Sequence, residues 1–428
     1  EGIDATNDLS FLCIQASMHT QLPAPSFSVR IWNGTPNELL IKCAELTRTG
    51  VGLPAYYNDE VIIPALMSRG VTLADAREYG IIGCVEPQKP FKTDGWHDAA
   101  FFNMCRPLEL VFSNGVDKGA QISIKTGNVE DMTTFEEFYN AYKAQETYMI
   151  GLMVNAINAI DTAHSERVPL PFLSCMVEDC VKEGKTVQEG GAHYNFTGPQ
   201  GFGIANMADG LWAVKTLVFD EKKVTMAELK DTLIHNYGQG LSPKAAKNAT
   251  QEVVINLAKA GKSVNESQVA DICRMFLTGE QDPTKRKRYE EILDMINELP
   301  KYGNDIEEID MLARDVANIY AKELEKHKNP RGGMFQAGLY PVSANVPLGE
   351  QTGATPDGRL ANTPIADGVG PRQGADTKGP TAAANSVAKL EHGRASNGTL
   401  YNQKFHPSAL SGNAGLQNFA SYIRAFFD

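Results

Sequence analysis

The segment at residues 80–87, with the sequence Gly-Ile-Ile-Gly-Cys-Val-Glu-Pro, constrains the fold of this chain more than any other. Its apolar residues follow a glycine and stop at Pro87, which predicts a short buried strand whose pairing ends at the proline. In a strand, the period of two sends the side chains of Cys84 and Glu86 to the same face. A thiol and a carboxyl group would then share one pocket at the tip of a strand.

Cys84 and Glu86 together fit an enzyme in which sulfur carries a hydrogen atom and a carboxylate moves a proton. Hydrogen-atom transfer uses the neutral S–H group, so Cys84 needs a dry, rigid pocket rather than a lowered pKa. A nucleophilic cysteine would need a basic neighbour instead, and the nearest histidine in the sequence is His97. Two simpler interpretations stay open, because a single cysteine is often a small core residue and a single glutamate is often a surface carboxylate.

Five sequence blocks, in a fixed order, resemble the glycyl radical enzymes and in particular their glycerol and propanediol dehydratase branch. The blocks are Gly83–Pro87, Gly95–Asp98, Asn329–Gly333, Thr355–Arg359 and Asn402–Pro407. The resemblance covers essentially the whole chain. It implies an α/β fold: a ten-stranded barrel of the pyruvate formate-lyase type, surrounded by helices, with the Cys84 loop inside. We expect residues 1–428 to form one such barrel domain, in partial form.

Two parts of the family pattern have no counterpart in this sequence. The radical-bearing motif Arg-Val-x-Gly-Tyr does not occur, and the chain ends with Phe426-Phe427-Asp428. The N-terminal third or more of the family pattern is also absent. We therefore expect a fragment of a longer enzyme that lacks the C-terminal glycine radical domain and is inactive by itself.

The resemblance assigns catalytic roles to three residues. It implies that Cys84 forms a thiyl radical and that Glu86 is the base that takes the hydroxyl proton of the substrate radical. It implies that Asp98 forms hydrogen bonds with the substrate hydroxyl groups. The alternative for Asp98 is an ordinary helix cap.

Three further residues are expected at the substrate wall, namely His97, Phe101 and Tyr340. In choline-cleaving relatives a threonine and a tyrosine are expected in place of His97 and Phe101, so their absence argues against a trimethylammonium substrate. Such a cation favours a cage of electron-rich rings. For Tyr340, core packing with a hydrogen-bonded hydroxyl group is an equal alternative.

The implied reaction is the anaerobic dehydration of a small vicinal diol, glycerol or propane-1,2-diol, to an aldehyde. The resemblance implies a radical on a glycine, installed by a separate activating enzyme that uses S-adenosylmethionine and an iron–sulfur cluster. It implies no metal or organic cofactor bound to this chain, and a homodimer. Three alternatives stay open: another lyase of the family (a choline trimethylamine-lyase or a sulfonate lyase), a non-radical cysteine enzyme, and an inert structural fragment.

Composition narrows the partners and the compartment. The net charge is −12 and no basic stripe occurs, which argues against nucleic acid and anionic membranes as partners. No apolar run reaches the roughly 18 residues of a membrane span, and the first residues lack a signal-peptide pattern. The seven cysteines are scattered, which is typical of free thiols in a reducing cytoplasm. The expected location is the cytoplasm or a bacterial microcompartment within it.

Helix signals divide the chain. Capping boxes at Thr35–Glu38 and Thr225–Glu228 predict two helix starts, and a long helix is expected over about 134–164. Residues from about 240 to 300 are rich in Lys, Glu, Ala and Asn and are expected to form a peripheral helical insertion. From Asn329 onward, long ordered loops are expected to line the barrel, with Asp357 and Arg359 paired in a turn.

Overall fold

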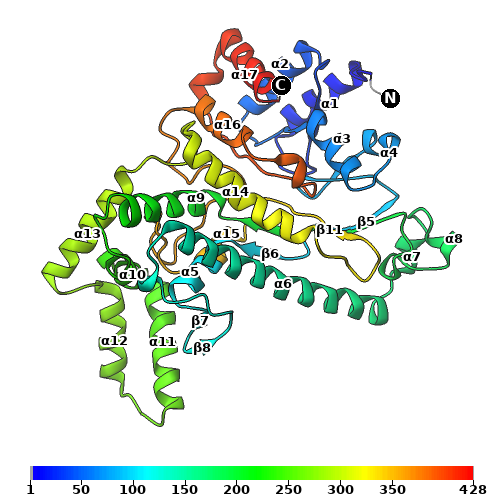
Figure 1. The fold of residues 1–428 in the computed structure, drawn as a ribbon. Helices are drawn as coiled ribbons and strands as arrows, with labels where there is room; N and C mark the ends of the chain where they lie inside the picture. The colour runs from blue at the N-terminus through cyan, green and yellow to red at the C-terminus, as the bar shows by residue number, and fades with distance from the viewer. Residues whose placement is uncertain (1–2, 428) are drawn as a thin grey trace.

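The computed structural model describes residues 3–427 as a mixed α/β structure (Figure 1). The helices of the first half are α1 (Asp8–Thr20), α2 (Asn37–Arg48), α3 (Asp59–Ser68), α4 (Leu73–Arg77), α5 (Cys105–Phe112), α6 (Phe135–Arg167), α7 (Pro171–Ser174), α8 (Cys180–Glu183) and α9 (Ile204–Ala213). Those of the second half are α10 (Met226–Ile234), α11 (Pro243–Lys259), α12 (Glu266–Thr278), α13 (Pro283–Glu298), α14 (Glu307–Leu324), α15 (Asn345–Gly349), α16 (Pro380–Ala388) and α17 (Gly412–Phe427).

The strands form small sheets between these helices. They are β1 (Ser28–Ile31), β2 (Ala55–Asn58), β3 (Gly80–Ile82), β4 (Glu86–Gln88), β5 (Thr93–Trp96), β6 (Phe101–Asn103), β7 (Val116–Asp117), β8 (Ala120–Gln121), β9 (Tyr194–Thr197), β10 (Gln200–Phe202) and β11 (Met334–Phe335). Parallel pairing joins β1 with β2, β6 with β10, and β9 with both β5 and β11, while β3–β4 and β7–β8 are antiparallel hairpins. The described strands do not form one ten-stranded sheet, so that detail of the expected barrel is not confirmed.

Two apolar cores hold the molecule together. The larger one gathers residues from α5, α6, α9, α14 and the loops that follow β11. The smaller one joins the two ends of the chain, because Leu40 and Leu46 of α2 pack with Leu416 and Phe419 of α17. Figure 1 shows α1, α2 and α17 grouped together at one end of the molecule, apart from α6 and α9.

The long predicted helix and one of the two predicted caps agree with the structure. Thr134 caps α6, and Glu137 completes the capping box from the third position of the helix. Thr225 and Glu228 do the same for α10. The capping box predicted at Thr35 is wrong, because Pro36 precedes α2 without a side-chain cap, and the Thr35 hydroxyl accepts a hydrogen bond from the Trp32 amide instead.

Residues 240–300 form three helices of two kinds. α11 and α12 project from the body as a hairpin (Figure 1), and α12 has no buried residue. α13, in contrast, buries Ile292 and Ile296 completely in the larger core. The expectation of a wholly peripheral segment is therefore wrong for α13, and whether the hairpin is an insertion stays a prediction.

No helix among residues 3–427 is both long and apolar enough to cross a membrane. Within the same residues, no group of three or more His, Cys, Asp or Glu side chains is placed to hold a metal ion.

Candidate active site

Cys84 lies in the tight turn between β3 and β4. The two strands pair antiparallel, with Ile82 opposite Glu86, so that residues 83–85 form the connection. Gly83 has a φ of 60°, a left-handed conformation that glycine adopts without strain. The prediction that Cys84 is part of a continuous strand is therefore wrong, because the chain reverses direction at Gly83. The thiol-bearing residue is exposed in this chain.

Glu86 holds this turn in place. Its carboxylate oxygen Oε2 accepts hydrogen bonds from the backbone amides of Cys84 at 2.7 Å and of Val85 at 2.6 Å. The residue is only 1% exposed, so the interpretation as a surface carboxylate is wrong. A Cβ atom on Gly83 would come within 2.8 Å of Glu86 Oε1, so this position leaves no room for a side chain. The pairing of Cys84 with Glu86 thus arises from the carboxylate folding back on the turn, not from strand alternation.

Tyr57 and Tyr340 pack against the turn that carries Cys84. The Tyr57 hydroxyl group, from β2, donates a hydrogen bond to the backbone carbonyl of Cys84. Tyr57, Val85 and Tyr340 also form a small buried apolar cluster. The backbone of the turn is therefore fixed at both its amides and its carbonyl, and the Cys84 side chain sits on a rigid support.

Tyr340 reaches Asp98, which lies on the loop between β5 and β6. Its hydroxyl group donates to Asp98 Oδ1 over 3.2 Å and accepts from the side-chain amide of Gln200 over 2.6 Å. Tyr340 itself is completely buried. No helix follows Asp98, because the chain passes through a turn into β6 at Phe101, so the alternative of a helix cap at Asp98 is wrong.

Burial and the nearby carboxylates change the pKa values of Cys84, Asp98 and Tyr340. Partial burial raises the pKa of the Cys84 thiol, and the charges of Glu86 and Asp98 raise it further, which favours the neutral S–H form. Burial also raises the pKa of Asp98, with a contribution from the charge of Glu86, while the hydrogen bond from Tyr340 opposes the increase. Burial and the two nearby carboxylates raise the pKa of Tyr340 as well, so its phenol keeps its proton.

His97 is buried and already saturated with hydrogen bonds. Its Nδ1 atom lies 2.7 Å from Asn397 Oδ1, and its Nε2 atom lies 2.9 Å from Gln88 Oε1. Burial lowers the pKa of His97. Both ring nitrogens therefore bind protein side chains, and direct hydrogen bonding to a substrate would require one of these contacts to break.

Phe101 begins β6 opposite Gln200 of β10, and it is 37% exposed. The structure thus brings Cys84, Glu86, Asp98 and Tyr340 into one interacting group. His97 is the sequence neighbour of Asp98, and Phe101 is the direct strand partner of Gln200. Contact of His97, Phe101 and Tyr340 with a substrate stays a prediction.

Three residues of this group were not found from the sequence: Tyr57, Gln200 and Asn397. Asn397 donates from Nδ2 to the backbone carbonyls of His97 at 2.9 Å and Gly198 at 3.2 Å. Each of these residues is an isolated polar side chain far from Cys84 in the sequence. Gln200 was visible only as part of a glycine-rich segment that was interpreted as a packed turn.

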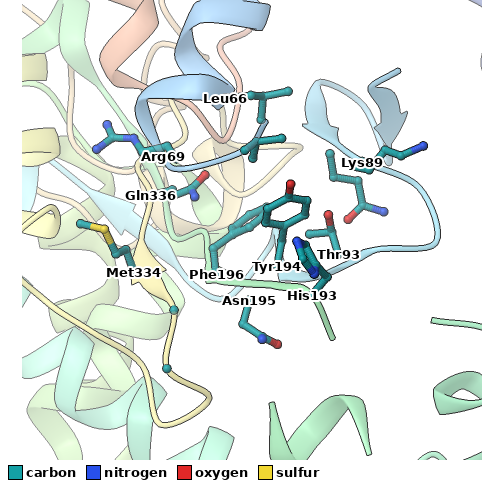
Figure 2. A pocket seen from close by; sticks show the side chains of 14 residues that line it. Leu66, Arg69, Lys89, Thr93, His193, Tyr194, Asn195, Phe196, Met334 and Gln336 are labelled. Carbon is teal, nitrogen blue, oxygen red and sulfur yellow. The ribbon is translucent and has the colours of Figure 1, made fainter. Parts of the chain in front are cut away.

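A cavity of about 240 Å³ is lined in part by Gln88 and Phe196, two residues that contact His97 (Figure 2). It is lined by the ends of α3, β4, β9 and β11, and Figure 2 shows Phe196, Tyr194 and His193 along one wall with Lys89 and Thr93 nearby. Gln88 and Phe196 separate the cavity from His97, since Gln88 binds the ring and Phe196 packs edge-on against it. Cys84, Glu86 and Asp98 do not line this cavity.

Two of the late sequence blocks, Asn329–Gly333 and Thr355–Arg359, make buried structural contacts. Arg331 is 1% exposed at its side chain and binds the carboxylates of Asp94 at 2.8 Å and Asp161 at 3.0 Å, which ties β5 to α6. The turn at Thr355–Arg359 forms as expected, but the expected ion pair between Asp357 and Arg359 is wrong. Arg359 binds the Thr355 hydroxyl group, whereas Asp357 pairs with Arg372 at 3.5 Å.

Comparison with protein families gives two matches that together cover most of the chain. A family described as pyruvate formate lyase-like matches residues 1–349, and a family described as glycine radical matches residues 365–428. The second match differs from the expectation that one barrel domain takes in residues 1–428 and that the glycine radical domain is absent. The sequence itself contains no Arg-Val-x-Gly-Tyr segment.

Similar solved structures and curated relatives support the same family assignment. The chain is 63% identical, with a TM-score of 0.94, to a structure that concerns 1,2-propanediol dehydration in Roseburia inulinivorans. The match covers 100% of this chain and 51% of that one. The chain is 54% identical, with a TM-score of 0.87, to the glycerol-bound B12-independent glycerol dehydratase of Clostridium butyricum. That match covers 100% of this chain and 48% of the dehydratase. The chain is also 36% identical to the (2S)-3-sulfopropanediol dehydratase of Klebsiella oxytoca, over 99% of this chain and 46% of the relative.

These neighbours share the barrel fold of the glycyl radical enzymes, which confirms the expected α/β fold class. The chain spans about half the length of the relatives that it matches.

Proposed function

This chain belongs to the pyruvate formate lyase-like family of glycyl radical enzymes, and we propose that it carries the cysteine-containing half of a dehydratase for a small vicinal diol. The proposal is carried by one observation: Glu86 binds the backbone of Cys84, and Asp98 lies close enough for its charge to act on both residues. A hydrogen-atom carrier, a base and a hydroxyl acceptor therefore face one small region.

The first step uses Cys84. A thiyl radical at its sulfur takes a hydrogen atom from the hydroxyl-bearing carbon at the end of the diol, which forms an S–H bond and leaves a carbon radical. The raised pKa of Cys84 suits this step, because the group must exist as a neutral thiol when it is not a radical. The hydrogen bonds to its amide and carbonyl keep the sulfur on a rigid turn, which limits side reactions.

The second step uses Glu86. Its Oε2 atom is occupied by two backbone amides, so we assign Oε1 as the oxygen that takes the proton of the substrate hydroxyl group. The resulting ketyl-like radical anion expels the neighbouring hydroxyl group. The departing hydroxide takes this proton from Glu86 and leaves as water, which returns Glu86 to its carboxylate form. The product radical then recovers its hydrogen atom from Cys84, so that a diol becomes an aldehyde and water.

Asp98 orients the substrate in this scheme. A carboxylate accepts hydrogen bonds from two neighbouring hydroxyl groups, and it repels a sulfonate or other anion in the same position. A quaternary ammonium group would instead seek aromatic rings, and Phe101 contributes one ring only. The chemistry of the residues therefore favours an uncharged diol, such as propane-1,2-diol or glycerol, over choline or isethionate.

The proposal concerns a full-length protein that includes the radical-bearing glycine. We propose that a separate enzyme with S-adenosylmethionine and an iron–sulfur cluster installs the radical, under anaerobic conditions. The full-length protein is proposed to be a homodimer in the cytoplasm or in a bacterial microcompartment. The alternative is another carbon–heteroatom lyase of the same family, since the relatives act on several substrates.

The test compares four substrates with activated full-length enzyme: propane-1,2-diol, glycerol, choline and isethionate. We expect aldehyde formation from a diol to be fastest. Trimethylamine or sulfite release in preference to aldehyde would overturn the diol assignment and leave the radical mechanism in place.

The matched variant is Cys84→Ser, with Cys175→Ser as the control because Cys175 is also exposed but lies on the loop after α7. Cys84→Ser should abolish turnover while the glycyl radical signal in electron paramagnetic resonance persists, because an O–H bond is too strong to exchange hydrogen atoms in the relay. Appreciable turnover by Cys84→Ser would identify a different hydrogen-atom carrier.

A further inference from the structure

Gln200 is completely buried at the start of β10, and its side-chain amide contacts Tyr340 of the candidate active site. Its Nε2 atom lies 2.6 Å from the Tyr340 hydroxyl oxygen and 3.2 Å from the Gly198 carbonyl, and it also contacts the His97 carbonyl. Its Oε1 atom has no hydrogen-bond partner among the described residues. No part of the proposed reaction uses this residue.

The orientation of the Gln200 amide follows from its neighbours. Two backbone carbonyls surround one end of the side chain, and a carbonyl can only accept a hydrogen bond. An amide oxygen at that end would face two acceptors, so the nitrogen must lie there. The oxygen then points at Gly338, where an added Cβ would stand 1.8 Å from Oε1. Gly338 leaves the space that this orientation requires.

An amide nitrogen is a donor only and has two N–H bonds, which the two closest acceptors, the His97 carbonyl and the Tyr340 hydroxyl oxygen, receive; the Gly198 carbonyl at 3.2 Å is the farthest of the three. Because Gln200 donates to the Tyr340 oxygen, the phenolic proton must point toward the nearby carboxylates, where Asp98 Oδ1 lies 3.2 Å away. The Glu86 carboxylate is a second nearby acceptor and also raises the pKa of Tyr340. Asp98 therefore receives a hydrogen bond and does not donate one to Tyr340. The hydrogen bonds therefore point in one direction: Gln200 donates to Tyr340, and Tyr340 donates to Asp98.

We propose that Gln200 is a positioning residue: its amide fixes the phenolic proton of Tyr340 on Asp98, and so keeps Asp98 as an acceptor for the substrate hydroxyl groups. The inference rests on the proposed function for its catalytic consequence, but the hydrogen-bond direction can be measured without turnover. Gln200 does not touch the substrate in this scheme, and it acts through Tyr340.

The ionisable groups that face Asp98 are Glu86, Cys84 and Tyr340. The charge of Glu86 raises the pKa of Asp98, and the hydrogen bond from Tyr340 lowers it. Loss of that hydrogen bond should therefore raise the pKa of Asp98 further. An acceptor in place of the Gln200 amide nitrogen would draw the phenolic proton away and produce this loss.

The experiment measures the pKa of Asp98 in unactivated full-length protein. Infrared titration of the protonated-carboxyl band is performed for each protein and for the same protein with Asp98→Asn, and the difference isolates Asp98. We expect Tyr340→Phe and Gln200→Glu to raise this pKa by a similar amount. Gln200→Met removes the donor that holds the phenolic proton on Asp98, so the pKa should also rise in this variant, but by less than in Gln200→Glu because methionine supplies no competing acceptor.

The combination Gln200→Glu with Tyr340→Phe separates the proposed relay from a direct charge effect. Under the relay, the double variant shows no further increase over Tyr340→Phe alone. A full additive increase, or no increase in Gln200→Glu, would overturn the proposal. Gln145→Met is the control for loss of a buried amide, since Gln145 is equally buried in α6 but binds Ser123 and the loop before that helix.

Activated enzyme gives the second readout. Gln200→Glu should lower the kcat for the diol about tenfold or more with an intact radical signal, and Gln200→Met should retain more activity than Gln200→Glu. Equal activity of the two variants would count against the positioning role. If the wild-type enzyme carries the radical and turns over no diol, the proposed function fails, while the pKa measurement still decides the role of Gln200.

Discussion

Gly398 packs directly against Val85, so closely that a Cβ atom at position 398 would stand 2.3 Å from the Val85 carbonyl oxygen. Gly398 also has a φ of 102°, which L-amino acids with side chains rarely adopt. The contact joins a segment that matches the glycine radical family to the turn that carries Cys84. The position of the turn that carries Cys84 therefore depends on a glycine more than three hundred residues away.

Gly398→Ala should move the Val85 backbone and with it Cys84. We expect activity of the full-length enzyme to fall at least tenfold and the free energy of unfolding to fall by about 1–3 kcal/mol, from the strained φ and the close contact. Activity assays and urea unfolding measure the two effects. Gly393→Ala is the control, because an added Cβ there meets nothing within 4 Å. Equal losses in both variants would contradict the contact.

Glu146→Gln should stabilise the protein at neutral and alkaline pH. Glu146 lies buried on α6, neither carboxyl oxygen has a partner among the described residues, and burial raises its pKa to about 8 from 4.5. Because the folded state holds the proton more tightly, stability is fullest below about pH 4.5 and falls as the pH rises toward 8. The neutral glutamine removes this fall, for a gain of up to about 3 kcal/mol at pH 7.

Urea unfolding at pH 5 and pH 8 tests the Glu146 prediction. The advantage of Glu146→Gln should be small at pH 5 and larger at pH 8. Glu136→Gln, at an exposed position on the same helix, should show no such trend. A constant difference between the variant and the wild type across this range would show that Glu146 does not bind a proton on folding.

The sequence predicted the elements whose signals are local. Thr225 and Glu228 lie three residues apart and form the capping box that begins α10, as predicted from their spacing. Local signals failed where two interactions competed: the Thr35 hydroxyl binds the Trp32 amide, so it does not cap α2. The proximity of Cys84 and Glu86 was predictable from their spacing, and the structure brings the two residues into contact.

The geometry of the site was not predictable, because long-range contacts determine it. Strand alternation suggested a shared face for Cys84 and Glu86, but Gly83 turns the chain and the carboxylate returns to the backbone amides. Gln200 and Asn397 reach His97 across 103 and 300 positions of sequence. No periodicity or motif in a single sequence reports such contacts. The family resemblance supplied the roles of residues but not these supports.

Arg331→Lys should destabilise the protein although it preserves the charge. The guanidinium binds Asp94, Asp161 and the carbonyl of Phe196 at 2.9 Å, with five donors in a planar arrangement that an ammonium group cannot reproduce. We expect the free energy of unfolding to fall by about 2–4 kcal/mol, since buried partners lose their hydrogen bonds. Arg274→Lys on exposed α12 should change little, and equal effects would refute the clamp.

Asp98→Asn tests the substrate-binding carboxylate directly. The variant keeps the size of the side chain but loses the negative charge and one acceptor oxygen, while Tyr340 can still donate to the amide oxygen. The turn that carries Cys84 is held by Glu86 and Tyr57, so folding should survive. We expect the barrier for diol turnover to rise by about 2–4 kcal/mol. Kinetics with propane-1,2-diol measure this, at equal radical content determined by electron paramagnetic resonance.

The alternative for Asp98 is a purely structural side chain, and the variant separates the two. A structural role predicts a lower melting temperature with little change in kcat/KM per radical, whereas substrate binding predicts the reverse. Asp271→Asn, on the exposed face of α12, is the control for the loss of one acidic charge. Unchanged kcat/KM in Asp98→Asn would remove Asp98 from the site. Cys84 and Glu86 would then have to orient both hydroxyl groups without it, although Glu86 Oε2 already binds two backbone amides.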